Sequence, residues 1–175
     1  SYLNGVSSPN LGIGNVFTVE FWLYLISTPS GSNAMYVTDF RGGSTNNYTF
    51  GVIDISGNTR LYAFCGSGGG EVRGSTNITT GTWYHLAYVN TGSTLTGYLN
   101  GVSQGTLAVS FSQAATNVIV GARYTGATEY VNGYVDDLRI TKGYARYTTT
   151  FTPPTAAFPD SYTPAVTTSI IPTST

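Results

Sequence analysis

The stretch FTVEFWLYL, residues 17–25, decides the fold class of this 175-residue chain. Every second position in it is a large apolar residue: Phe17, Val19, Phe21, Leu23 and Leu25. Because successive side chains of a strand point to opposite faces, this alternation predicts a β-strand with one face in a core. The other face carries Trp22 and Tyr24, which predicts a central strand covered on both sides. Glu20 shares that second face, and we expect its carboxylate to bond nearby backbone or hydroxyl groups.

Similar period-two segments recur along the chain, whereas helical periodicity does not extend over a useful length. They are TWYHLAYV (82–89), LTGYLNGV (95–102), FGVIDI (50–55), RLYAFC (60–65) and the stretches 117–122 and 134–140. The Asn100-Gly101 pair predicts a type I′ hairpin turn, because both positions tolerate positive φ, and 56–58 predicts a similar turn. Short strands with frequent turns predict an all-β fold, an antiparallel sandwich or barrel.

The composition indicates a folded domain with a neutral polar surface. Charged residues make up 9% of the chain and the formal net charge is −1, which argues against nucleic acid as a partner. The surface must be built from 28 Thr, 17 Ser, 12 Asn and 22 Gly, while 41% hydrophobic residues supply a core. We expect no membrane insertion, because no run approaches about 18 apolar residues. Cys65 is the single cysteine, so an internal disulfide is excluded.

The chain divides into a predicted domain over 1–160 and a tail over 161–175. Ten of the fifteen tail residues are Ser, Thr or Pro and none is charged, which is typical of an extended tail or linker. Because the chain starts at Ser1 rather than Met, we expect it to be processed or an excerpt from a longer protein.

Four motifs together resemble a known family. In chain order they are FTVEFWLYL, GTWYHLAYV, LTGYLNGV and GYVDDLRITKGYARYTTTFTPPTAAFPD, the last at 133–160. The chain resembles laminin-G-like, concanavalin-A-like jelly-roll domains over about residues 2–160, and is most similar to their bacterial and bacteriophage branch. The resemblance implies a two-sheet jelly roll whose first and last strands lie side by side. It also implies an extracellular location, on a virion surface or a secreted fibre, but this fold hosts several functions.

The acidic residues do not predict an enzyme. Glycosidases need two carboxyl groups flanking one bond, yet no two acids here stand two positions apart on one strand. Asp136 and Asp137 are adjacent, and adjacent residues of a regular strand face opposite ways. His85 has no Ser or Cys nucleophile beside it in sequence, so we expect a packed, hydrogen-bonded core histidine. Three basic residues near the end are expected to form a solvated or carboxylate-paired strand edge: Arg139, Lys142 and Arg146.

A calcium site is implied by the resemblance, since related jelly rolls often bind calcium at the rim or near the terminal strands. The candidate ligands are Asp39, Asp136 and Asp137, because calcium is held by carboxylate and carbonyl oxygens. The alternative is that one Asp of the pair bonds backbone amides while the other is solvated. Both interpretations stay open at this stage.

Carbohydrate binding is the predicted activity. Neutral sugars are bound by aromatic faces and by amide and hydroxyl groups, and the glycine-rich loops here are flanked by such side chains. The candidate ligand-binding residues are Asn46, Asn47, Tyr48, Arg73, Tyr124 and Tyr130. We therefore predict a non-catalytic, lectin-like module that attaches a phage particle or secreted bacterial structure to surface glycans. The alternative is a structural or decoration module that packs against copies of itself, as a homo-oligomer, or against other virion or fibre proteins.

Overall fold

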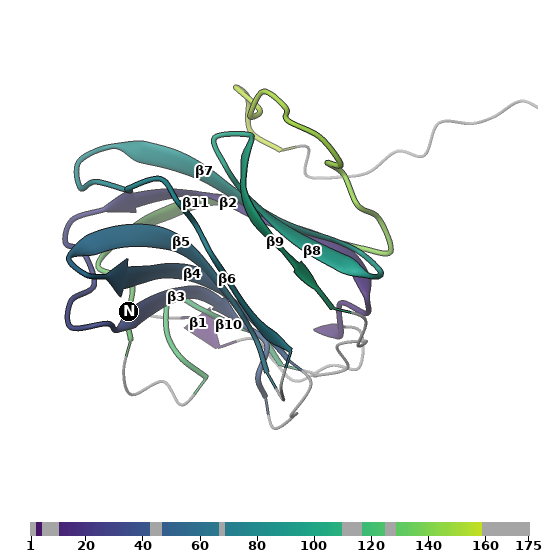
Figure 1. The fold of residues 1–175 in the computed structure, drawn as a ribbon, viewed down its shortest axis with the longest axis horizontal. Coiled ribbons are helices and arrows are strands. Elements are labelled where there is room, and N and C mark those ends of the chain that lie inside the picture. The colour runs from purple at the N-terminus through teal and green to yellow at the C-terminus, as the bar shows by residue number, and fades with distance from the viewer. Residues whose placement is uncertain are drawn as a thin grey trace, which may run out of the picture.

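The computed structural model describes residues 3–4, 11–42, 47–66, 69–109, 117–124 and 129–158. Within these ranges the chain forms eleven strands and no α-helix (Figure 1), so the predicted all-β class is confirmed. The tail predicted over 161–175 lies outside the described residues. No helix in the described ranges is long and apolar enough to cross a membrane.

Two antiparallel sheets stack face to face, which confirms the predicted sandwich (Figure 1). The six-stranded sheet has the order β1-β10-β3-β4-β5-β6, formed by β1 (Leu3–Asn4), β10 (Ile119–Val120), β3 (Ala34–Asp39), β4 (Tyr48–Ile55), β5 (Asn58–Cys65) and β6 (Gly70–Arg73). The five-stranded sheet has the order β11-β2-β7-β8-β9, formed by β11 (Gly133–Lys142), β2 (Val16–Leu25), β7 (Trp83–Thr91), β8 (Thr94–Leu99) and β9 (Val102–Ala108).

The terminal strands only partly follow the expected side-by-side arrangement. The last strand, β11, pairs along its length with β2, the first long strand. The two-residue β1, however, pairs with β10 in the other sheet, where Leu3 lies opposite Val120. The expectation is therefore correct for β2 and wrong for β1, because β1 adds to the edge of the six-stranded sheet.

The core lies between the sheets and is rich in aromatic rings. Phe50 stacks on Tyr88 with ring centroids 4.5 Å apart, and Tyr48 lies 4.9 Å from Phe17. The hydroxyls of these two tyrosines are hydrogen-bonded: the Tyr88 hydroxyl donates to the Gly51 carbonyl at 2.7 Å, and the Tyr48 hydroxyl accepts from the Asn90 amide at 2.9 Å. Such pairing removes the cost of burying a polar group in an apolar core.

The two glycine turns form as the sequence predicted. Asn100 and Gly101 have φ of 49° and 79°, and they join β8 to β9. Ser56 and Gly57 have φ of 53° and 80°, and they join β4 to β5. Positive φ at both central positions is the signature of the type I′ turn, whose twist matches that of the strands it connects.

Strand β11 is not regular, because a β-bulge interrupts its pairing with β2. Asp136 lies opposite Trp22 and Arg139 lies opposite Glu20, so β11 uses one residue more than β2 between these two pairs. Asp137 has a φ of 48° at this point. The bulge places both Asp136 and Arg139 on the sheet face that points away from the core, which alternation in a regular strand would not do.

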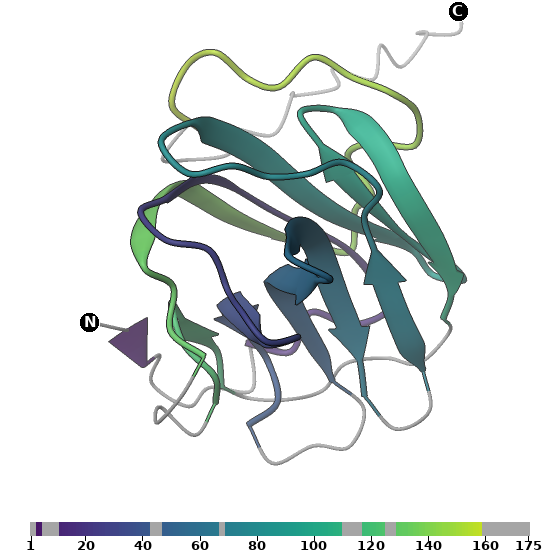
Figure 2. The same cartoon turned by 60° about the vertical axis from the view of Figure 1, so that its left-hand side comes forward.

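Residues 143–158, here called the strap, lie across the outer face of the five-stranded sheet (Figure 2). The backbone N–H of Arg146 donates to the Thr18 hydroxyl at 2.9 Å, and the N–H of Phe151 donates to the Gly101 carbonyl at 3.1 Å. Strap side chains pack on a separate small core made by Ala87, Val89 and Tyr98. The strap thus buries one half of this face, the covered half, and leaves the other, the open half, to solvent.

Candidate functional site

Three aromatic side chains form a row across the open half of this face. Tyr134 on β11 lies opposite Tyr24 on β2, and Tyr24 lies opposite Trp83 on β7. Because each cross-strand partner points to the same face, the sheet itself sets the three rings side by side. These three residues are called the aromatic row below.

The aromatic row is accessible and closely spaced. The ring of Tyr24 lies 5.5 Å from that of Trp83, at an interplanar angle of 54°, and 5.8 Å from that of Tyr134, at 45°. Trp83 is 42% exposed and Tyr134 is 59% exposed, while Tyr24 between them is half-buried. Large apolar rings held at the surface are a form of exposed patch that indicates a binding surface.

A second row, one step along the strands, separates the aromatic row from the strap. Its members are His85, Trp22 and Asp136, which lie opposite one another on β7, β2 and β11. Trp22 is half-buried and meets His85 edge-on, with ring centroids 5.3 Å apart. Its third member, Asp136, is exposed, and one carboxylate oxygen accepts the backbone N–H of Asp137 at 2.9 Å. The open half therefore combines aromatic rings with one surface carboxylate.

Beneath the strap the same strands carry a buried polar network around Glu20. The Arg139 Nε donates to Glu20 Oε1 at 2.8 Å, and the Tyr147 hydroxyl donates to Oε2 at 2.8 Å. His85 Nε2 lies 3.3 Å from Oε2, close enough for an ion pair but not aligned as a hydrogen bond. Burial by itself raises the pKa of Glu20, but the contacts with His85, Arg139 and Tyr147 outweigh it and hold that pKa below its ordinary value.

This network joins the strap to the sheet rather than forming an accessible reactive centre. The side chains of Glu20 and His85 are fully buried, so the packed position predicted for His85 is confirmed. The predicted hydrogen bonding is not found, because neither ring nitrogen of His85 has a hydrogen-bond partner among the described residues. The partners expected for Glu20 were backbone and hydroxyl groups, and the structure adds Arg139, which sequence reasoning did not pair with it. Arg146 Nε lies 3.9 Å from the same carboxylate, so two of the three basic residues near the chain end are carboxylate-paired.

Two of the predicted sugar-binding residues lie inside the molecule, which corrects the expectation for them. Tyr48 is fully buried and packs in the core, because the first residue of β4 points inward, and burial raises its pKa above the ordinary value. Asn47 is 6% exposed, and its backbone carbonyl accepts a hydrogen bond from the backbone N–H of Gly66. Neither side chain is presented as a surface platform. Asn46 lies outside the described residues.

The other predicted sugar-binding residues are at the surface but not together. Tyr124 is 42% exposed and Tyr130 is 43% exposed, and both follow β10 near one edge of the six-stranded sheet. Arg73 is on β6, at the opposite edge of that sheet, where it pairs with Glu71 at 2.6 Å. Because β3, β4 and β5 separate β10 from β6, Arg73 does not share a site with the two tyrosines.

The predicted calcium ligands do not form a shared donor set among the described residues. The Asp39 carboxylate accepts hydrogen bonds from the Arg41 side chain and from the backbone N–H of Tyr124, so its oxygens are already engaged. The Arg41 guanidinium in turn lies over the rings of Tyr36 and Tyr124, at 4.7 and 5.2 Å. Within the described ranges no group of three His, Cys, Asp or Glu side chains could hold a metal ion. Calcium binding stays a prediction, tested by thermal denaturation with and without a chelator.

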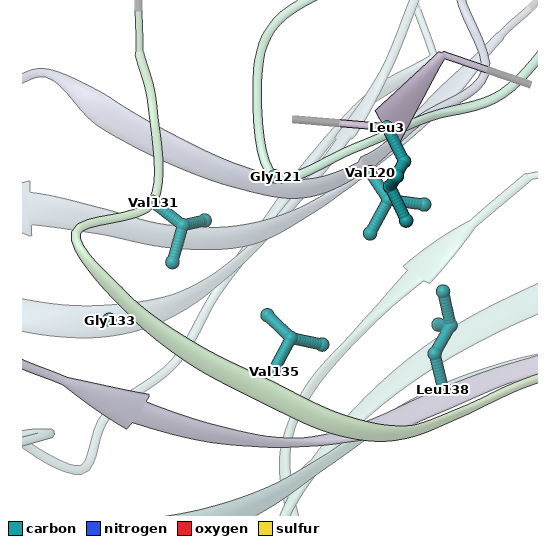
Figure 3. A pocket seen from close by; sticks show the side chains of 7 residues that line it. All are labelled: Leu3, Val120, Gly121, Val131, Gly133, Val135 and Leu138. Carbon is teal, nitrogen blue, oxygen red and sulfur yellow. The ribbon is translucent and has the colours of Figure 1, made fainter. Parts of the chain in front are cut away.

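A pocket of about 340 Å³ opens between the two sheets where β11 faces β1 and β10 (Figure 3). Its lining consists of aliphatic side chains and two glycines: Leu3, Val120, Gly121, Val131, Gly133, Val135 and Leu138. No side chain in this lining carries a hydrogen-bonding group, so the pocket lacks the placed polar side chains that fix a sugar in a binding site. None of the predicted site residues lines it.

Sequence reasoning missed the aromatic row, although it placed Trp22 and Tyr24 on one face of the first strand. The signal was the presence of large rings on the second face of that strand. It predicted a strand covered on both sides, which is correct at Glu20 and wrong at Tyr24. The difference depends on where the strap crosses the sheet, and strand periodicity carries no information on that.

The fold and the aromatic row define an antiparallel two-sheet β-sandwich with an open aromatic surface on one sheet. The chain belongs to the concanavalin A-like lectin/glucanases superfamily, whose model matches residues 2–146. The comparison with curated protein sequences found no match.

Solved structures with the same fold come from diverse proteins. Domain 4 of AbnA, an extracellular arabinanase from Geobacillus stearothermophilus, solved with arabinotriose, is 23% identical with a TM-score of 0.57. The alignment covers 77% of this chain and 64% of that one, so this chain spans less than two thirds of its length. The heptameric SAP-like pentraxin from Limulus polyphemus is 21% identical with a TM-score of 0.60, over 79% of this chain and 68% of that one. The enzymatically active domain of tailspike protein 2 of bacteriophage CBA120 is 13% identical with a TM-score of 0.52, over 79% of this chain and 23% of that one.

Proposed function

We propose that this protein is a non-catalytic carbohydrate-binding module whose ligand stacks on the aromatic row. The observation that carries the proposal is the register of Tyr134, Tyr24 and Trp83, which sets three rings side by side at an open surface. The apolar faces of sugar rings pack on aromatic side chains, and an aromatic ring brings a large contact area at little conformational cost. Membership of a lectin and glucanase superfamily supports the same function.

Binding without cleavage is supported by the carboxylates of this face. A glycosidase needs two accessible carboxyl groups flanking one bond. Glu20 is buried under the strap with both oxygens engaged, so it cannot act as the partner of Asp136. The test is incubation of the protein with each bound glycan, where we expect no new reducing ends. Steady product release would contradict the proposal.

The two tryptophans of the chain provide a direct measurement. Trp22 and Trp83 both lie on the open half, so their fluorescence reports on this surface without a label. We expect a neutral glycan identified by an array screen to change the emission, and Trp83→Ala to weaken binding at least tenfold. Tyr144→Ala is the matched control, because Tyr144 is 61% exposed on the strap and outside the row. Equal loss of affinity in both variants, or no glycan bound in any screen, would contradict the proposed function.

The setting we propose is outside the cell, on a phage particle or a secreted bacterial structure. The supporting observations are the neutral, Thr-rich composition and the fold shared with an extracellular arabinanase and a phage tailspike protein. The alternative prediction, a homo-oligomeric decoration or structural module, would use the aromatic row as a protein interface. Light scattering separates the two, since self-association that Trp83→Ala abolishes would favour the structural role.

A further inference from the structure

We infer that the aromatic row binds an internal stretch of a linear, uncharged glycan, one sugar residue on each ring. This inference rests on the proposed function and narrows its ligand to a class. It concerns chain length, chain shape and charge, each of which follows from a separate feature of the open half.

The spacing of the rings indicates three consecutive subsites. The steps of 5.8 Å from Tyr134 to Tyr24 and 5.5 Å from Tyr24 to Trp83 are close to the length of one sugar residue in an extended chain. The spacing arises because adjacent strands lie about 4.7–4.9 Å apart and each strand contributes one ring. A chain lying across the strands would therefore place successive sugars on successive rings.

The row is open at both ends, which suits an internal stretch rather than a chain terminus. The two outer rings, Tyr134 and Trp83, are the exposed ones, at 59% and 42%. A site for a terminal sugar would enclose that residue on several sides, as small-molecule sites do. Here the ring that is most enclosed, Tyr24, is the middle one.

The tilt between the rings selects the shape of the chain. Neighbouring rings meet at 54° and 45° rather than lying in one plane, so a flat polysaccharide ribbon cannot stack on all three. A chain that turns from one sugar to the next presents its faces at successive angles and matches the row. The twist of the sheet, about 20–25° between neighbouring strands, supplies part of this tilt, and the side-chain torsions of the rings supply the rest.

The charges around the row select against anionic sugars. Asp136 is exposed beside the row, two residues along β11 from Tyr134 on the same face. The basic residues of this face near the strap are Arg139 and Arg146, and both are paired with Glu20. The Arg139 guanidinium also lies 3.7 Å from the ring centroid of Phe158. An anionic sugar on the row would meet a carboxylate without a compensating cation, which is unfavourable because like charges repel.

The experiment is a chain-length series measured by tryptophan fluorescence and titration calorimetry. The neutral probes are arabino-, malto- and xylo-oligosaccharides of one to six residues, and the anionic probes are oligogalacturonides of the same lengths. For the neutral series that binds, we expect affinity to rise at least tenfold from one to three residues and to change less than threefold beyond. Oligogalacturonides should bind at least tenfold more weakly than neutral chains of equal length.

One variant at an end of the row tests a subsite, and one variant beside the row tests the selection against charge. Tyr134→Ala should remove the gain between two and three residues and leave the affinity for a disaccharide nearly unchanged. Asp136→Asn should strengthen oligogalacturonide binding at least threefold and leave neutral chains unaffected. Melting curves confirm folding, and because both side chains are exposed, neither change removes core packing.

The outcomes distinguish a failure of this inference about the glycan class from a failure of the proposed carbohydrate binding. A monosaccharide that binds as tightly as a trisaccharide, or an oligogalacturonide that equals its neutral counterpart, would overturn the inference and leave carbohydrate binding intact. The same holds if Tyr134→Ala weakens all chain lengths equally. Failure of every glycan, neutral or anionic, to bind would overturn the proposed function, and this inference with it.

Discussion

The covered and open halves of one sheet face differ in what happens to equivalent positions of the same strands. On β2, Glu20 and Tyr24 are both on the outer face, four residues apart. Glu20 is fully buried by the strap and bonded to Arg139 and Tyr147, whereas Tyr24 lies in an open row of rings. The strap thus divides a single surface into a structural part and a part available to a ligand.

The comparison teaches that side-chain chemistry alone does not assign a role to a residue of this face. Aromatic rings occur in both halves: Tyr147 and Phe151 stack in the strap at 3.6 Å between centroids, while Tyr24 and Trp83 form the row. In the covered half the rings are held by partners on both sides, so their removal should cost stability. In the open half one side of each outer ring faces solvent, so its removal should cost binding.

The largest effect is expected from Glu20→Gln. The change removes a buried charge and leaves Arg139, whose side chain is only 20% exposed, without its counter-ion. Breaking a buried ion pair from one side costs about 3–5 kcal/mol, and urea denaturation measures it. The control is Glu71→Gln, because Glu71 pairs with Arg73 at the surface and its loss should cost less than about 1 kcal/mol. Similar losses of stability in the two variants would contradict a structural role of the buried polar network around Glu20.

Removing one ring from each half should have opposite effects on stability and on glycan affinity. Phe151→Ala removes a half-buried ring that packs on Tyr147, Tyr98 and His85, and we expect a loss of about 2 kcal/mol of stability. Tyr134→Ala removes an exposed ring and should cost about 0.5 kcal/mol. Glycan affinity should show the reverse order, unchanged in Phe151→Ala and weakened in Tyr134→Ala. A loss of both properties in both variants would abolish the distinction between the halves.

A smaller effect tests how the strap is anchored to the β8–β9 turn. Gly101 and Gly57 occupy the same turn position with φ of 79° and 80°, so alanine is strained equally at both. A Cβ at Gly101 would collide with the Phe151 carbonyl of the strap, whereas a Cβ at Gly57 would meet open space. We therefore expect Gly101→Ala to be more destabilising than Gly57→Ala by about 1–2 kcal/mol. Equal melting temperatures would show that the strap is not held there.

The smallest effect is a pH dependence that belongs to the covered half. The pKa of Glu20 is lower in the folded protein than its ordinary value near 4.5, because burial is outweighed by its three partners. Below about pH 4.5 the unfolded chain takes up a proton at Glu20 before the folded chain does, so stability falls as pH decreases. Denaturation of the wild type and of Glu20→Gln between about pH 6 and 3 isolates this contribution, and the variant should show the flatter profile. Parallel profiles would mean that Glu20 titrates alike in both states.

Much of the fold could be predicted because its determinants are local. The alternation in 17–25 and the Asn100-Gly101 pair depend on backbone geometry within a few residues, and both appear as expected. The site was harder to predict. Tyr48 stands beside a glycine-rich loop in sequence, but the pairing of β4 with β3 and β5 turns its ring inward. A single bulge at Asp137 moves Arg139 to the face of Glu20, and strand periodicity gives no sign of it.

By itself, the sequence determined that this chain forms twisted antiparallel strands with apolar inner faces and a neutral surface, because period-two patterning and turn chemistry act over short distances. Only the tertiary structure decided which outer-face residues are buried and which are available. That choice depends on where the strap, more than a hundred residues after β2 in the chain, crosses the sheet. Contacts between segments so far apart are set by the packing of the whole domain, and no local pattern in either segment encodes them.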